Sequence, residues 1–143
     1  MPSATIHASA VLVGARAVLI RGPSGSGKSR LAFELIEAAR SGALRFARLV
    51  GDDRVHIEAA HGRLVVRAAA RLAGLIEIRG LGIRKLPYEP SAVVGLVVDL
   101  AAHAERLPQA DRQRTELEGI AVAWLAVAAG QPALPAVLAL LTS

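Results

Sequence analysis

Gly22-Pro-Ser-Gly-Ser-Gly-Lys-Ser29 is the stretch of sequence that decides the fold. It has the G-x-x-x-x-G-K-S spacing of a phosphate-binding loop. The apolar run Ala17–Ile20 comes before it, and an amphipathic segment, residues 28–40, follows it. A strand, a glycine-rich turn and the start of a helix form the context in which this motif binds nucleotides rather than only tightening a turn. The sequence therefore predicts a nucleotide site on a strand–loop–helix unit.

Each part of the motif has its own chemical task. The glycines allow the backbone to wrap closely around phosphates with its N–H groups pointing inward, and the helix start attracts anions. Lys28 has the length to reach the outer phosphates, and the Ser29 hydroxyl can ligate Mg²⁺. The predicted nucleotide-binding residues are Gly22, Pro23, Ser24, Gly25, Ser26, Gly27, Lys28 and Ser29.

The pattern around the loop predicts one helix packed on a largely β-stranded sheet. The apolar positions of segment 28–40 have the helical period, and Ser41-Gly42 ends that helix. Strands are expected at 4–13, 17–21, 46–50, 55–59, 64–67, 75–78 and 92–100, and a second helix at 134–141. Segment 102–119 is polar and irregular, and segment 120–127 fits either a strand or a helix. These elements predict an α/β fold, with α+β as the alternative, in a single nucleotide-binding domain over residues 1–143.

Composition narrows the class of protein. The chain has 143 residues, 53% of them apolar, and no cysteine, so disulfides and cysteine-based metal sites are excluded. The N-terminus lacks the pattern of a secretory signal, and we expect a cytoplasmic protein without a membrane segment. The net charge is +5, but the arginines are scattered and aromatics make up only 3% of residues. This pattern argues against a nucleic-acid partner and fits a partner or substrate with acidic groups.

Asp52 and Asp53 follow the predicted strand 46–50 directly. A carboxylate at such a strand end commonly holds or orients Mg²⁺ in phosphate-loop proteins. A second carboxylate can accept a proton from a hydroxyl nucleophile. Neighbouring side chains of an extended chain point to opposite faces, so we expect two different roles. A solvated turn is the alternative reading of this pair.

The other candidate residues are less specific by spacing. Glu77 and Arg79 alternate along a predicted strand before a double-glycine loop, which suits metal and phosphate as well as it suits a solvated face. His7 is isolated, and a lone histidine is most often a surface or core residue. Arg112 lies in a charged stretch whose default reading is a solvated surface.

Four of these features together resemble the catalytic domain of bacterial HPr kinase/phosphorylase, over roughly residues 5–140. The phosphate loop is similar to the Gly-x-Ser-Gly-x-Gly-Lys-Ser loop of that family. Leu49-Val-Gly-Asp-Asp-Arg-Val55 resembles its Leu-Val-Ala-Asp-Asp-x-Val segment, and Glu77-Ile-Arg-Gly-Leu-Gly-Ile83 resembles the family signature. His7, fifteen residues before Gly22, lies where the family has a histidine.

The resemblance implies a fold like that of HPr kinase and PEP carboxykinase and the phosphorylation of a serine on HPr, the phosphocarrier of the sugar phosphotransferase system. ATP and Mg²⁺ are the implied cofactors, an HPr-like protein the implied partner, and a homo-oligomer the implied assembly. The resemblance also implies a role for each candidate residue. Lys28 would bind the transferring phosphate, and Ser29 and Glu77 would ligate the metal. Asp53 or Asp52, with Asp53 preferred, would be the base, His7 would orient or tune that base, and Arg112 would stabilise charge on the phosphoryl group.

Two departures from the family pattern qualify these roles. The N-terminal domain of longer members has no counterpart, and short single-domain members are a known pattern. The Pro-Val-x-Pro-Gly-Arg-Asn stretch tied to phosphorolysis corresponds to Ala126-Val-Ala-Ala-Gly-Gln-Pro132, in which Gln131 replaces the arginine. Loss of that guanidinium removes a charge and a forked phosphate contact. The expected enzyme is therefore a kinase with little or no phosphorylase activity.

Two other functions remain open at the sequence level. An ATP-binding regulatory module of a phosphotransferase or two-component pathway would dock on partners without transferring phosphate. A small-molecule kinase would share the phosphate loop, but no arginine-rich lid segment is evident. It would also leave the resemblance of segment 77–83 to the family signature unexplained.

Overall fold

The computed structural model describes residues 4–102 and 114–142. Its elements follow one another along the chain as β1 (Ala4–Ile6), β2 (Ser9–Val13), β3 (Arg16–Arg21), α1 (Lys28–Arg40), β4 (Ala47–Gly51), β5 (Val55–Ala60), β6 (Arg63–Ala68), the short 3₁₀ turn η1 (Ala70–Leu72), β7 (Leu75–Ile78), β8 (Gly82–Lys85), β9 (Ser91–Ala102), β10 (Arg114–Leu117), β11 (Ile120–Ala128) and α2 (Ala133–Thr142).

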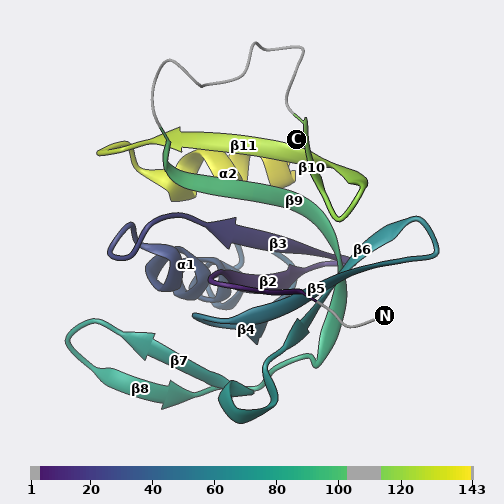
Figure 1. Cartoon of the computed structure of the whole chain (residues 1–143). Coiled ribbons are helices and arrows are strands. Elements are labelled where there is room, and N and C mark those ends of the chain that lie inside the picture. Colours follow the sequence, from purple (N-terminus) through teal and green to yellow (C-terminus); the bar gives the residue numbers. More distant parts are fainter. Residues whose placement is uncertain (1–3, 103–113, 143) are drawn as a thin grey trace.

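A curled, mixed sheet forms the body of the molecule (Figure 1). Its strand order is β1-β5-β6-β9-β3-β2-β4. Strand β11 also pairs with β9, and β10 pairs with β11. The central strand β9 runs parallel to β3 and β11 and antiparallel to β6. The hairpin β7–β8 forms a separate two-stranded sheet, in which Ile76 of β7 is buried in the cluster beside α1 and β8 is exposed. Because β3, β9 and β11 are parallel, their C-terminal ends meet at one edge, which is where the phosphate loop begins.

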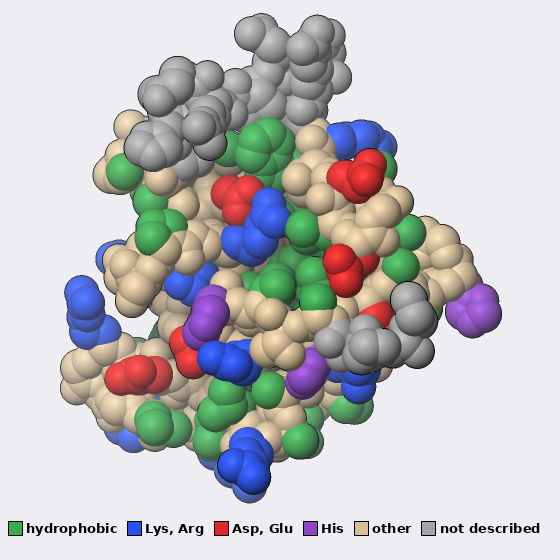
Figure 2. Space-filling model, viewed as in Figure 1, with side chains coloured by type: hydrophobic (Ala, Val, Ile, Leu, Met, Phe, Trp, Pro, Cys, Tyr) green, Lys and Arg blue, Asp and Glu red, His purple; other side chains and the backbone are tan. Residues whose placement is uncertain are grey.

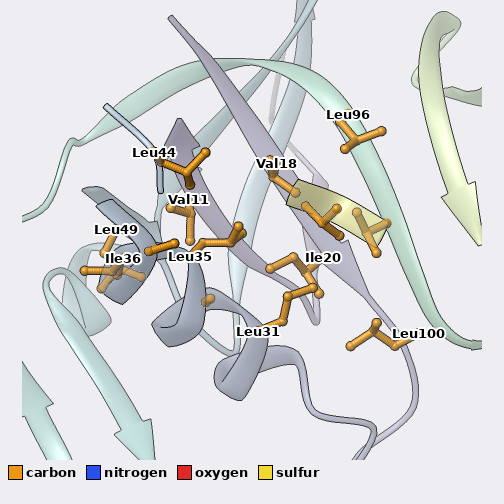
Figure 3. Close-up of a cluster of buried hydrophobic side chains, with 14 of the residues drawn as sticks. Val11, Val18, Ile20, Leu31, Leu35, Ile36, Leu44, Leu49, Leu96 and Leu100 are labelled. Carbon is orange, nitrogen blue, oxygen red and sulfur yellow. The ribbon is translucent and has the colours of Figure 1, made fainter. Parts of the chain in front are cut away.

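Two apolar clusters cover the two faces of the central strands. Val18 and Ile20 pack with α1 and α2 in one cluster, shown in Figure 3, whereas Ala17 and Leu19 belong to the cluster on the opposite face. All four side chains are buried, with at most 1% exposure. A strand covered on both faces has a continuous apolar sequence, which explains why this segment shows no polar alternation.

The fold class predicted from the sequence is confirmed. Helix α1 has the predicted bounds, and segment 120–127, left open between strand and helix, is strand β11. Two predictions were wrong. The loop expected after residue 78 contains strand β8, with Arg79 in the turn rather than on the face of β7, and the irregular segment 102–119 includes β10.

The uncharged run 119–143 does not form one long helix. It divides into β11 and α2 at a turn in which the Gln131 N–H donates to the Ala128 carbonyl over 3.0 Å. Among the described residues, no helix is both long enough and apolar enough to cross a membrane.

Charged side chains of both signs are distributed over the surface. On the face shown in Figure 2, basic side chains are separated from one another by acidic and apolar ones. This face therefore does not present the continuous basic stripe that tracks a phosphate backbone.

Candidate functional site

The phosphate loop connects the end of β3 to the start of α1. Gly27 is the N-cap of α1 with φ +100°, a conformation that glycine adopts without steric cost, and no side chain caps the helix. The first turn of α1 contains no acidic residue either. The N–H groups at this helix end and its positive dipole are therefore left for an anion from outside the helix.

Lys28 spans the loop instead of pointing into solvent. Its Nζ donates to the carbonyl of Gly22 over 2.9 Å and to that of Pro23 over 3.2 Å. These contacts hold the ammonium group across the mouth of the loop, so a bound phosphate would compete with the two carbonyls for it. The Ser26 hydroxyl is buried in the same loop without a hydrogen-bond partner within the described part of the chain.

Asp52 connects three separate segments beside the loop. The Ser29 hydroxyl donates to its carboxylate, 2.7 Å from Oδ1 and 3.0 Å from Oδ2. The Ser9 hydroxyl donates to Oδ1 over 2.6 Å, and the Glu77 backbone N–H donates to Oδ2 over 3.3 Å. The side chain is only 4% exposed. A buried carboxylate needs such donors, and here they fix it against the residue predicted to ligate Mg²⁺.

This donor set fits magnesium. Hydroxyl and carboxylate oxygens are its preferred ligands, and it is usually held by one or two protein groups together with substrate phosphates and water. The described residues contain no cluster of three or more acidic, histidine or cysteine side chains able to cage a metal without substrate. Ser29, which donates to Asp52, is therefore the group among the described residues best placed to hold Mg²⁺ when nucleotide phosphates supply the other ligands.

Asp53 is held differently from its neighbour. The Arg54 N–H donates to the Asp52 carbonyl over 2.7 Å, which closes a three-residue γ-turn around Asp53. Asp53 has φ +69° and is exposed. A positive φ in a tight turn costs free energy in a residue other than glycine, and such strain is typical of functional positions. The sequence predicts that the two carboxylates differ through the alternation of an extended chain, whereas here a turn leaves Asp52 buried and Asp53 exposed.

The remaining candidates are only partly brought together. The backbone N–H of Glu77 bonds to Asp52, but the side chain of Glu77 is exposed on the β7–β8 hairpin. His7 is exposed, with Nε2 3.4 Å from Nη2 of Arg54, and no described contact joins it to Asp53. Arg112 lies outside the described residues.

One charged cluster at the same sheet edge was missed from the sequence. Arg21, the residue before the loop, donates to both carboxylate oxygens of Asp99 over 2.8 and 2.7 Å, and the Trp124 indole N–H donates to Asp99 over 2.7 Å. These residues join β3, β9 and β11 next to the loop. A charged residue inside the apolar run of β9 was the available signal, because a half-buried carboxylate needs a partner.

A Gly22→Ala substitution is expected to lower the free energy of unfolding by about 1–3 kcal/mol and to weaken nucleotide binding. The new Cβ would lie 2.5 Å from Ser26 Oγ and 3.1 Å from the Leu100 carbonyl oxygen, which belongs to the backbone and cannot easily move. Urea unfolding and an ATP titration measure both effects. Gly14→Ala is the matched control outside the loop, because φ is +63° there but no described atom beyond its chain neighbours lies within 4 Å of the new Cβ. Equal losses in both variants would contradict the packing argument.

Comparisons with known proteins show which family this chain belongs to. The family model described as HPr serine kinase C-terminal domain matches residues 1–128. An HPr kinase/phosphorylase of Clostridium tetani is 36% identical over 108 residues, which cover 73% of this chain and 33% of that protein. One from Clostridium beijerinckii is 42% identical over 82 residues, covering 57% of this chain and 25% of that protein. The chain thus spans no more than about a third of these curated relatives.

A solved structure shows the same fold. The HPr(Ser) kinase/phosphatase from Coxiella burnetii superposes with a TM-score of 0.76 at 24% identity, covering 96% of this chain and 88% of that one. With the family model matching residues 1–128 of the 143, the chain belongs to the HPr serine kinase C-terminal domain family.

Proposed function

We propose that residues 1–143 form one catalytic domain that transfers the γ-phosphate of ATP to a seryl hydroxyl of an HPr-like phosphocarrier protein. One observation carries the proposal. The phosphate-loop Ser29 is hydrogen-bonded to the buried Asp52, and the exposed Asp53 comes next in the chain, in a strained turn. This arrangement offers a metal-orienting carboxylate and an accessible carboxylate side by side. Membership of the HPr serine kinase family supports the choice of reaction and acceptor.

The loop residues bind and orient the nucleotide. The backbone N–H groups at the start of α1 surround the phosphates, and Lys28 transfers its contacts from the two loop carbonyls to the outer phosphate oxygens. Mg²⁺, when bound, neutralises charge on the β- and γ-phosphates. The Ser29 hydroxyl donates a hydrogen bond to Asp52, so the lone pairs of its oxygen remain free for the metal.

Asp53 is the proposed base. Asp52 accepts from Ser9, Ser29 and the Glu77 backbone, which leaves it little capacity to accept a substrate proton. Asp53 is exposed and can reach an incoming seryl hydroxyl. Its carboxylate accepts the proton as the seryl oxygen bonds to the γ-phosphorus and the bond to the leaving ADP oxygen breaks.

The other family-derived roles remain part of the proposal. His7 orients or tunes the Asp53 carboxylate, Glu77 assists in holding the metal, and Arg112 stabilises charge on the transferring group. The hydrogen bond from the Glu77 backbone N–H to Asp52 supports the role proposed for Glu77.

Radiolabelled ATP tests the proposed function. We expect label from the γ-position to appear on a serine of purified HPr when Mg²⁺ is present. An ATP-binding regulatory module would bind the nucleotide and HPr and leave HPr unlabelled. Binding without label would therefore favour that second function and contradict the kinase.

The reverse reaction is expected to be weak. Gln131 replaces the arginine of the family stretch and lies in the exposed turn after β11. Because β11 and β3 both run parallel to β9, β11 ends at the edge of the sheet where the phosphate loop begins. A neutral amide lacks the charge and the forked donors that hold inorganic phosphate. Phosphoserine-HPr incubated with inorganic phosphate should release pyrophosphate much more slowly than the kinase reaction proceeds, and Gln131→Arg should raise that release. Rapid release by the unaltered chain would refute this expectation.

A further inference from the structure

We propose that Ser9 is a positioning residue for the magnesium site, an inference that rests on the proposed function. Ser9 and Asp52 are the two polar or charged side chains classed as buried among the described residues, at 0% and 4% exposure. They are 43 residues apart in the sequence and bond to each other over 2.6 Å. The Ser9 hydroxyl thus supplies a buried donor to Asp52 within an otherwise apolar interior, and Ser29 and the Glu77 backbone N–H are the other donors to this carboxylate.

The register of the sheet explains why Ser9 can reach this carboxylate. Ser9 is the first residue of β2, opposite Ile20 of β3, and the next residue along β2 lies opposite Gly51, the last residue of β4. The start of β2 therefore lies between the strand that leads into the phosphate loop and the strand that leads into Asp52. A serine at this point donates sideways to the first residue beyond β4.

The hydroxyl of Ser9 fixes which way Asp52 faces. Ser9 and Ser29 both donate to Oδ1, and Ser29 also lies within 3.0 Å of Oδ2. Without Ser9, a carboxylate in this apolar setting would lack its shortest hydrogen bond and could rotate toward other donors. Ser29 would then no longer be held with its lone pairs free for the metal. Removal of groups that orient metal ligands in this way commonly lowers metal affinity about 10- to 100-fold.

The test uses the coupling between ATP and magnesium in the full chain. Calorimetric titrations with ATP, in excess Mg²⁺ and in EDTA, give the ratio of the two dissociation constants. For Ser9→Ala we expect that ratio to fall about tenfold while the affinity in EDTA stays the same. In turnover assays, the Mg²⁺ concentration for half-maximal rate should rise and the rate at saturating Mg²⁺ should stay within about threefold. Ser9→Thr, which keeps the hydroxyl, should restore the coupling.

Two further variants separate positioning from a general effect on folding. Ser9→Cys keeps a side chain of similar shape but donates only weakly, and it should show the same loss of coupling even if Ser9→Ala does not fold. Val66→Ala shortens a side chain that is also 0% exposed, without removing a hydrogen bond, and should leave the coupling unchanged.

The outcomes distinguish this inference from the proposed function. Wild-type coupling in Ser9→Ala and Ser9→Cys would overturn the role of Ser9 and leave the kinase proposal standing. An equal loss of ATP affinity with and without Mg²⁺ would also overturn it, because that pattern indicates general damage to the loop. A wild-type chain that binds no ATP would overturn both.

Discussion

Lys28→Ala should reduce ATP turnover by about a thousandfold or more while the protein remains folded. The substitution removes the ammonium group that bonds to the Gly22 and Pro23 carbonyls and that we expect to move onto the transferring phosphate. Preorganised charge of this kind provides most of the rate acceleration in phosphoryl transfer, and removal of one such group typically costs two to three orders of magnitude or more. Steady-state ADP formation with saturating HPr and MgATP measures the effect.

The chain contains a convenient control for that experiment. Lys85, the only other lysine, is exposed on β8. Lys85→Ala removes the same charge from the same protein and should leave turnover within about twofold, because an exposed charge is screened by solvent. Unchanged thermal unfolding of both variants would show that neither effect comes from loss of structure. Turnover by Lys28→Ala close to wild type would contradict the role given to the loop.

Asp53→Asn should reduce phosphoryl transfer by about 10²- to 10⁴-fold and leave ATP affinity nearly unchanged. Asparagine has the same shape, and it tolerates the positive φ of 69° better than most residues, so the turn should persist. What is lost is the ability to accept the seryl proton. Single-turnover transfer to HPr, together with an ATP titration, measures the two quantities separately.

Asp52→Asn is the matched comparison for that variant. It removes the negative charge of the carboxylate that accepts hydrogen bonds from Ser9 and Ser29, so ATP binding in the presence of Mg²⁺ should weaken. The two single variants should thus differ in which quantity they change, although they are adjacent in sequence. Wild-type transfer rates in the Asp52→Asn/Asp53→Asn double variant would rule out either carboxylate as the base.

The elements around the phosphate loop could be predicted because local sequence determines them. Segment 28–40 combines a helical apolar period with a glycine turn before it and Ser41-Gly42 after it, and the helix has these bounds. The apolar run 17–20 predicts a buried strand because both faces are covered. A strand-end carboxylate near the phosphate loop could also be expected from the sequence, but which of Asp52 and Asp53 bonds to Ser29 could not.

The missed elements have weak local signals. Every residue of β8 is exposed, so Gly82–Lys85 shows no alternation between apolar and polar positions. β10 has only four residues and depends on pairing with β11. Such strands are formed by their partners rather than by their own sequence.

The missed site residues depend on contacts between distant segments. Ser9 is one serine in an ordinary strand until β2 is placed between β3 and β4. Asp99 on β9 has its partners on two other strands, because Arg21 of β3 and Trp124 of β11 donate hydrogen bonds to it. Neither the partner nor the distance is encoded in a local pattern, and no spacing rule could have linked these residues.

The most direct test of the central claim is a crystal structure with a non-hydrolysable ATP analogue and Mn²⁺, whose anomalous scattering locates the metal. We expect the metal at about 2.0–2.2 Å from Ser29 Oγ, the hydroxyl still donating to Asp52, and the γ-phosphate facing the Asp53 carboxylate. A metal bound away from Ser29, or a terminal phosphate out of reach of Asp53, would contradict the account.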